Sequence, residues 1–170
     1  MDAPRSAHEA RIVKEPALRA AKLDDRTFRQ IVRHTPLVSI DLIVLDGRGR
    51  ALLGLRADEP ARGFWFVCGG RIRKAEPIVE AFDRIVTDEL GWALDFSEAR
   101  PRGVYEHLYP TNRFEKPGCG THYVVLAYEI IQADDVEPRP DHQHSELTWW
   151  SVPDLLASPV VHPYTKAYFR

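Results

Sequence analysis

The chain has 170 residues, 44% of them hydrophobic and 28% charged, which predicts a single globular domain with a proper core. Lys and Arg total 23 against 25 for Asp and Glu, so we expect no nucleic-acid partner, although a few placed arginines could hold a small phosphorylated ligand. The apolar runs are strand-sized, so we expect no membrane-spanning helix. The first 23 residues lack the apolar segment of a secretory signal, and two cysteines make no disulfide framework; both features predict a cytoplasmic protein.

The N-terminal half of the chain predicts an arm, a helix and two paired strands. Residues 1–23 are expected to form a weakly structured arm, and residues 24–170 a single domain. A helix should begin near Asp24, which can cap it, and stop before Pro36. Strands are predicted over 37–45 and 51–56, joined by a tight turn, with both faces of the first strand buried.

The remaining elements alternate between strands and a few helices. A short strand is predicted over 64–70 and a helix over 76–90, with Pro77 in its first turn and Gly91 placed to end it. Further strands are expected over 103–109, 121–131 and 147–152, followed by short helices near 153–158 and 164–169. This order predicts an α/β sandwich with a mixed sheet.

The helix over 76–90 carries a carboxylate in an unusual place. Its apolar stripe at helical spacing consists of Ile78, Phe82, Ile85, Val86 and Leu90. Glu89 follows Ile85 by four residues and therefore projects from that stripe. A buried carboxylate is costly unless it is paired or bound to a metal, so the residues alone leave two interpretations open: an ion pair with an arginine, or a metal ligand.

The surrounding sequence resembles the Nudix hydrolases, whose box is written G-x5-E-x7-R-E-U-x-E-E-x-G-U. The positions that match this box are Gly70, Glu76, Arg84, Val86, Glu89 and Gly91. Ile85 replaces the second glutamate of the box, Asp88 the third, and Trp92 the final aliphatic residue. The resemblance implies a Nudix α/β/α sandwich. Fewer carboxylates argue against a multi-metal site, whereas a single Mg²⁺ shared with substrate phosphates would suffice.

From about Leu23 onward the chain looks like one Nudix subfamily, the GDP-mannose mannosyl hydrolases. The segments that carry this resemblance are TPLVSID, LLGLR, PARGFWFVCGGR, RGVYEHLY, THYVVL and DHQH. That subfamily also lacks the second box glutamate. The resemblance implies a homodimer and a Mg²⁺-dependent reaction on a nucleotide sugar, GDP-mannose or also GDP-glucose. In that reaction water attacks the anomeric carbon, inverts it and releases GDP.

The resemblance also assigns roles to individual residues. It implies that Glu89, the Gly69 carbonyl and Gln143 bind the metal, and that His144 is the general base. Arg56 and Arg71 match arginines that hold the pyrophosphate, and Tyr123 a tyrosine near the leaving phosphate. Asp41 and His107 match residues on the sugar side. Cys68 stands where the subfamily usually has proline, and Ser145 where an acid is expected.

Plainer interpretations of the same residues stay open. His142 and His144 could form half of a zinc site, or His144 could be an exposed residue without a function. Asp41 could cap a backbone group or pair with His107, and Arg56 could be a surface charge. Phe28 could stack on a guanine, although core packing is the better interpretation. The chain as a whole could instead be a conventional Nudix pyrophosphohydrolase that attacks phosphorus, or a silent module that binds nucleotide sugars.

Overall fold

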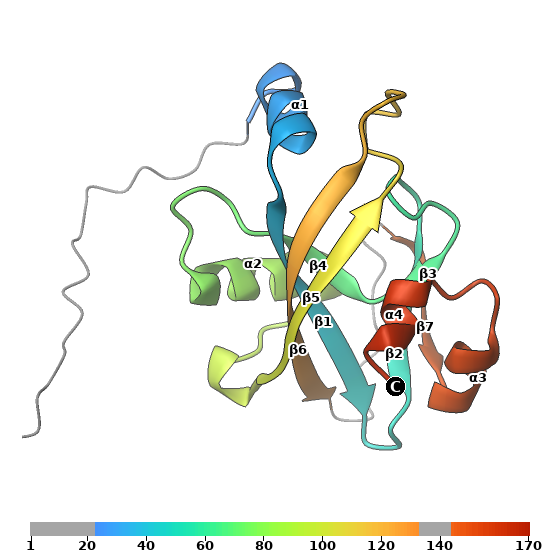
Figure 1. Ribbon diagram of the computed structural model, residues 1–170. Helices are drawn as coiled ribbons and strands as arrows, with labels where there is room; N and C mark the ends of the chain where they lie inside the picture. The colour runs from blue at the N-terminus through green and yellow to red at the C-terminus, as the bar shows by residue number, and fades with distance from the viewer. Residues whose placement is uncertain (1–22, 133–143) are drawn as a thin grey trace, which may run out of the picture.

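The computed structural model describes residues 23–132 and 144–170, which form a mixed sheet flanked by helices (Figure 1). The N-terminal half contains α1 (Asp25–His34), β1 (Leu37–Asp46), β2 (Ala51–Arg56), β3 (Trp65–Phe66), β4 (Cys68–Arg71) and α2 (Ile78–Leu90). The C-terminal half contains a 3-10 turn, η1 (Phe96–Glu98), then β5 (Arg100–Tyr109), β6 (Thr121–Gln132), β7 (His144–Trp150), α3 (Val152–Ala157) and α4 (Pro163–Ala167). The predicted arm over 1–23 lies outside the described residues, apart from Leu23.

The strands run in the order β3-β2-β1-β6-β5, with β4 paired to β1 and β7 paired to β2. β1 and β6 are parallel along their whole common length, from the Leu37–Tyr123 pair to the Asp46–Gln132 pair. Every other strand pair among the described residues is antiparallel. The sheet is therefore mixed, as the sequence predicts.

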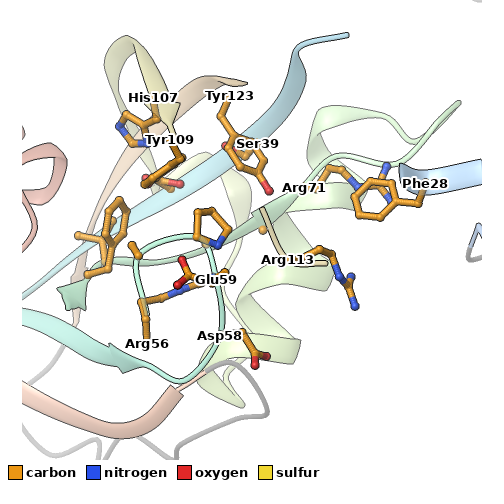
Figure 2. Close-up of a pocket in the computed structure, with 17 residues that line it drawn as sticks. Phe28, Ser39, Arg56, Asp58, Glu59, Arg71, His107, Tyr109, Arg113 and Tyr123 are labelled. Atoms are coloured by element: carbon orange, nitrogen blue, oxygen red, sulfur yellow. The ribbon is translucent and has the colours of Figure 1, made fainter. Parts of the chain in front are cut away.

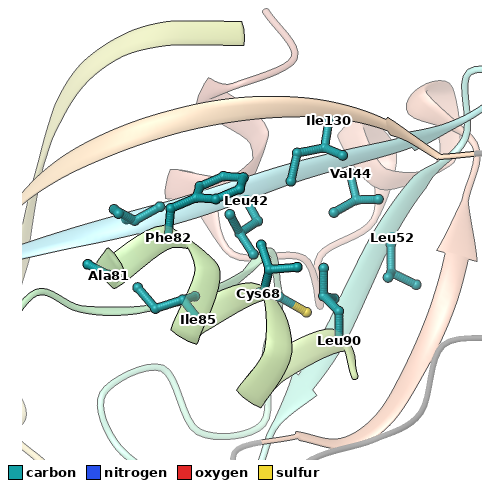
Figure 3. Packing of buried hydrophobic residues seen from close by; sticks show 11 residues of the cluster. Leu42, Val44, Leu52, Cys68, Ala81, Phe82, Ile85, Leu90 and Ile130 are labelled. Atoms are coloured by element: carbon teal, nitrogen blue, oxygen red, sulfur yellow. The ribbon is translucent and has the colours of Figure 1, made fainter. Parts of the chain in front are cut away.

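The two faces of β1 divide the core into two layers. On one face Ile40, Leu42 and Val44 pack against the apolar side of α2. Figure 3 shows Leu42 and Val44 in this cluster with Phe82 and Ile85 of the helix. On the other face Ile43 belongs to a cluster that includes Leu155 of α3 and Tyr168, next to α4. Helices cover both faces, so the predicted α/β/α sandwich is confirmed.

The structure corrects several predicted boundaries. The single strand expected over 64–70 is in fact two short strands, β3 and β4, separated at Val67. The chain breaks there because β3 pairs with β2, whereas β4 pairs with β1. The helix expected from Glu76 begins at Ile78, since Pro77 is still extended. Ile78 is 43% exposed, so it does not belong to the buried stripe. The last strand ends at Trp150, where Ser151 caps α3 by accepting a hydrogen bond from the Asp154 amide.

None of the helices within the described residues is long and apolar enough to cross a membrane.

Candidate active site

A pocket of about 520 Å³, shown in Figure 2, is lined in part by the glycine pair of β4, Gly69 and Gly70. Six of the residues predicted for the site line it: Asp41, Arg56, Gly69, Arg71, His107 and Tyr123. They come from β1, β2, β4, β5 and β6. A cavity of this volume is of the size that small-molecule ligands occupy.

The strand register explains why these side chains meet. Asp41 lies in the middle of β1, opposite Gly69 of β4 on one side and Ala127 of β6 on the other. His107 of β5 is opposite Tyr123 of β6. A Cβ at Gly69 would lie 2.6 Å from the Ile40 carbonyl oxygen and 2.8 Å from an Asp41 carboxylate oxygen. Only glycine allows β4 to approach β1 this closely.

Arginines lie on two sides of the pocket. Arg56 is half-buried at the end of β2, so it is not the free surface charge considered above. The Arg71 guanidinium lies 4.6 Å from the centre of the Phe28 ring, and burial lowers its pKa from the ordinary value. A third arginine, Arg113 in the loop before β6, lies 5.7 Å from the same ring. The sequence analysis did not identify Arg113, because a loop arginine carries no pattern of its own.

Phe28 both packs in an apolar cluster and lines the pocket. Its ring is 8% exposed and belongs to a small apolar cluster with Val32 and Leu37. It also lines the pocket, on the side opposite His107 in Figure 2.

A buried tyrosine links the two residues expected on the sugar side. The Tyr168 hydroxyl donates to the Asp41 carboxylate over 2.6 Å and lies 3.2 Å from Nε2 of His107. Asp41 and His107 are therefore connected through Tyr168. Burial raises the pKa of Asp41 to about 7 and lowers that of His107 to about 4. The sequence analysis missed Tyr168; its one signal was the four-residue spacing of Tyr164 and Tyr168 near the end of the chain.

Glu89 and His144, two further residues predicted for the site, form a buried pair. Glu89 is 3% exposed and His144 1%, and Oε2 of the glutamate lies 3.5 Å from Nδ1 of the histidine. The alternative that His144 is an exposed residue is therefore wrong. Among the described residues neither of the two lines the pocket, but His144 is the register partner of Arg56, which does.

The imidazole ring of His144 packs directly against Gly54 of β2. A Cβ at Gly54 of β2 would lie 2.2 Å from Cδ2 of the imidazole, so glycine provides the space that the ring occupies. Gln143 and His142, the neighbours that the sequence analysis names, lie outside the described residues.

The box residues Glu76 and Arg84 form a clamp. The Glu76 carboxylate accepts hydrogen bonds from Arg84 at 2.6 and 2.9 Å and from the Arg73 amide at 2.7 Å. Arg84 also donates to the carbonyl of Arg71 over 2.9 Å. These contacts lower the pKa of Glu76. They fasten the loop after β4 to α2 and so fix the end of the strand that carries Arg71.

The departure from the box at position 85 has a structural counterpart. Ile85 is 1% exposed, and its Cγ1 would lie 3.0 Å from a Cβ at Gly70, so its side chain supports the glycine pair from below. Asp88 is exposed and lies 3.7 Å from Arg84. Of the carboxylates on α2, Glu80, Asp83 and Asp88 are exposed, and Glu89 alone is buried.

These residues fit one hard cation better than a metal cage. Within residues 23–132 and 144–170, no three His, Cys, Asp or Glu side chains gather in a way that could hold a metal. Glu89 is a buried carboxylate four residues after Ile85, the α2 residue nearest Gly70, and both its side chain and the backbone carbonyls of β4 are hard oxygen donors. Such donors suit Mg²⁺, which takes few protein ligands and completes its shell with substrate phosphates and water.

Comparisons with known proteins identify the fold and the family of the chain. Residues 35–170 match the NUDIX domain family. The chain is 37% identical over 148 residues to the low-salt glycan biosynthesis protein Agl8 of Haloferax volcanii, covering 86% of this chain and 88% of that protein. A MutT NUDIX hydrolase from Burkholderia pseudomallei superposes with a TM-score of 0.65 and 28% identity, covering 80% of this chain and 97% of that one. The MutT protein of Methanosarcina mazei shares the fold, with a TM-score of 0.63 at 18% identity, over 80% of this chain and 92% of its own. The chain therefore belongs to the Nudix hydrolase family.

Proposed function

We propose that the protein is a Mg²⁺-dependent hydrolase of nucleotide sugars that converts GDP-mannose, with GDP-glucose as a second substrate, to GDP and the free sugar. The observation that carries this proposal is that Glu89 is the one buried carboxylate on α2. Ile85 occupies the core position at which the box has a glutamate. A single cation is enough to neutralise a departing diphosphate, whereas the two-metal arrangement that stabilises both the attacking and the leaving oxygen at phosphorus needs more carboxylate ligands than α2 provides. Attack at carbon is then the better-supported reaction. The relative named for glycan biosynthesis is in keeping with a nucleotide-sugar substrate.

The pocket supplies what a diphosphate leaving group needs. Arg56 and Arg71 reach it from the ends of β2 and β4, and a guanidinium donates to phosphate oxygens in pairs. When bound, Mg²⁺ on Glu89, the Gly69 carbonyl and Gln143 would add positive charge beside the same oxygens. As the bond from the anomeric carbon to oxygen breaks, its electron pair leaves with GDP, and the arginines stabilise the negative charge that develops.

The water needs only a base. We assign this role to His144, whose imidazole is adjacent to Glu89 and across the strand pair from Arg56. His144 takes one proton from the water as the oxygen bonds to the anomeric carbon, a contribution of about 10²- to 10⁴-fold in rate. Attack opposite the leaving group inverts that carbon, so an α-linked donor gives the β-sugar first.

The remaining assigned residues belong to the sugar and the leaving phosphate. Asp41 and His107 are assigned to the hydroxyls of the sugar, and Tyr123 to the leaving phosphate, because all three line the same pocket. The homodimer and the cytoplasmic location expected from the sequence stay predictions.

Product analysis tests the proposal. The enzyme is incubated with GDP-mannose, GDP-glucose and other nucleotide sugars in Mg²⁺, and the products are separated by anion exchange. GDP with free sugar supports the proposal, whereas GMP with a sugar phosphate would make the protein a conventional pyrophosphohydrolase. Tight binding of a nucleotide sugar without any turnover would make it a silent binding module. A Glu89→Gln variant should lose turnover, and Asp88→Asn, which removes the neighbouring exposed carboxylate, should keep it.

A further inference from the structure

Tyr168 joins the helical layer to the sugar side of the pocket. It lies at the C-terminal cap of α4, is 2% exposed, and packs edge-on against Tyr105 with 4.6 Å between the ring centres. Its hydroxyl lies within hydrogen-bond distance of both Asp41 and His107. Tyr168 is not one of the residues that line the pocket, so it acts on bound substrate through these two neighbours.

A count of hydrogens fixes the direction of both bonds. A tyrosine hydroxyl has one hydrogen to donate and lone pairs to accept. Above the raised pKa of Asp41 its carboxylate is ionised and can only accept, and the 2.6 Å distance is that of a charge-assisted O–H···O⁻ bond, so the hydroxyl hydrogen then points to Asp41. Burial and the nearby Asp41 raise the pKa of Tyr168, which keeps this hydrogen in place. The contact of 3.2 Å to His107 must then be donated by Nε2–H.

The surroundings of His107 hold its ring in one orientation. The ring stacks on Tyr164 at 4.2 Å with an angle of 6° between the planes, and Phe66 meets it edge-on at 5.8 Å. Burial and the nearby His162 keep its pKa low, so the ring is neutral at physiological pH. A neutral imidazole with hydrogen on Nε2 has none on Nδ1, and Nδ1 is then an acceptor.

We propose that Tyr168 is a positioning residue that sets the tautomer of His107, and that Nδ1 of His107 thereby accepts a hydrogen bond from a hydroxyl of the sugar. The inference rests on the proposed function for its ligand, but the tautomer itself does not depend on any substrate. It also gives α4, which is far from the box in sequence, a role in recognising the sugar.

The tautomer is measured by NMR on protein labelled with ¹⁵N at histidine, at about pH 8, where the ring is neutral. A His107→Gln variant assigns the signals. We expect a pyrrole-type shift for Nε2 and a pyridine-type shift for Nδ1 in the unaltered protein. In Tyr168→Phe, which keeps the ring and removes the hydroxyl, both nitrogens should move toward intermediate shifts.

Tyr164→Phe is the matched control. Among residues 23–132 and 144–170, the Tyr164 hydroxyl bonds only to the backbone of Leu108, donating to its carbonyl and accepting from its amide, each over 2.9 Å. This variant also removes one hydroxyl next to His107 but keeps the stacked ring, so the His107 tautomer should not change. A change in both variants would show that looser packing of α4, and not the Tyr168 bond, sets the shifts.

Kinetics test the link to the sugar. Tyr168→Phe should lower kcat/KM for GDP-mannose about tenfold and leave the affinity for GDP, which has no sugar, within about twofold. The inference is overturned if His107 carries its hydrogen on Nδ1, if Tyr168→Phe leaves the tautomer unchanged, or if that variant keeps full kcat/KM. If the unaltered protein does not hydrolyse GDP-mannose, the proposed function and the sugar contact fail, while the NMR result still decides the hydrogen-bond assignment.

Discussion

Replacing Glu89 with glutamine should separate the stability of the protein from its response to Mg²⁺. The Glu89 side chain is almost fully buried, and an ionised carboxylate in such a place is costly to keep. Glutamine has the same shape without the charge. The melting temperature of each protein without metal is the baseline, and the quantity compared is the rise that Mg²⁺ adds to it.

The magnitude of the metal response follows from linkage. With GDP present and Mg²⁺ at a hundred times its Kd, binding stabilises the folded protein by about 2.7 kcal/mol. For a chain of 170 residues this corresponds to a rise in Tm of roughly 5–10 °C. If the loss of the carboxylate weakens metal affinity about a hundredfold, the same Mg²⁺ concentration gives about 0.4 kcal/mol, a rise of only about 1 °C.

Differential scanning calorimetry with EDTA or Mg²⁺ in parallel measures both effects. Asp88→Asn is the control, because Asp88 is the adjacent carboxylate but is exposed and lies beside Arg84. It should keep the full rise in Tm. The assignment of Glu89 as a metal ligand would be refuted if Glu89→Gln kept that rise, or if Asp88→Asn lost it.

Three further predictions concern the clamp and the base. Glu76→Gln breaks a largely buried pair with Arg84 and should lower the free energy of unfolding by about 2 kcal/mol, measured by urea denaturation. The pKa of Glu76 is lower in the folded protein than in the unfolded chain. The stabilisation from the Glu76–Arg84 pair is therefore complete above the unfolded pKa and is lost as the pH falls through the folded pKa. The variant and the unaltered protein should accordingly have the same free energy of unfolding at acid pH. His144→Gln should lower kcat about 10²- to 10⁴-fold while keeping the Mg²⁺-dependent rise in Tm; full activity would exclude His144 as the base. Gly54→Ala places a Cβ 2.2 Å from the His144 ring and should lower kcat, with KM for GDP-mannose changed less; an unchanged kcat would show that the ring can shift without consequence.

The fold was predictable because its signals are local. The mostly apolar run of β1, the apolar stripe of α2 and the glycine that ends that helix each depend on neighbouring residues. The structure reproduces them, except that Ile78 of the predicted stripe is exposed. Boundaries set by pairing with distant strands were not predictable. The break at Val67 exists because β3 and β4 pair with different strands, which no local pattern records.

The site divides in the same way. The burial of Glu89 followed from its place on the apolar stripe, and Asp41, Arg56 and Arg71 were found through the resemblance. Tyr168 was missed because its importance comes from a contact with Asp41 across 127 positions in the chain. The burial of His144 was not predictable either, since the ring occupies the space that Gly54 leaves on another strand.

Hydrolysis of GDP-mannose in ¹⁸O-labelled water tests the central claim most directly. The products are separated, and the position of the label is read by mass spectrometry while the first anomer formed is observed by ¹H NMR. We predict that the label enters the sugar, that GDP carries none, and that β-mannose appears first. Label in the β-phosphate of GDP would place the attack at phosphorus and contradict the account.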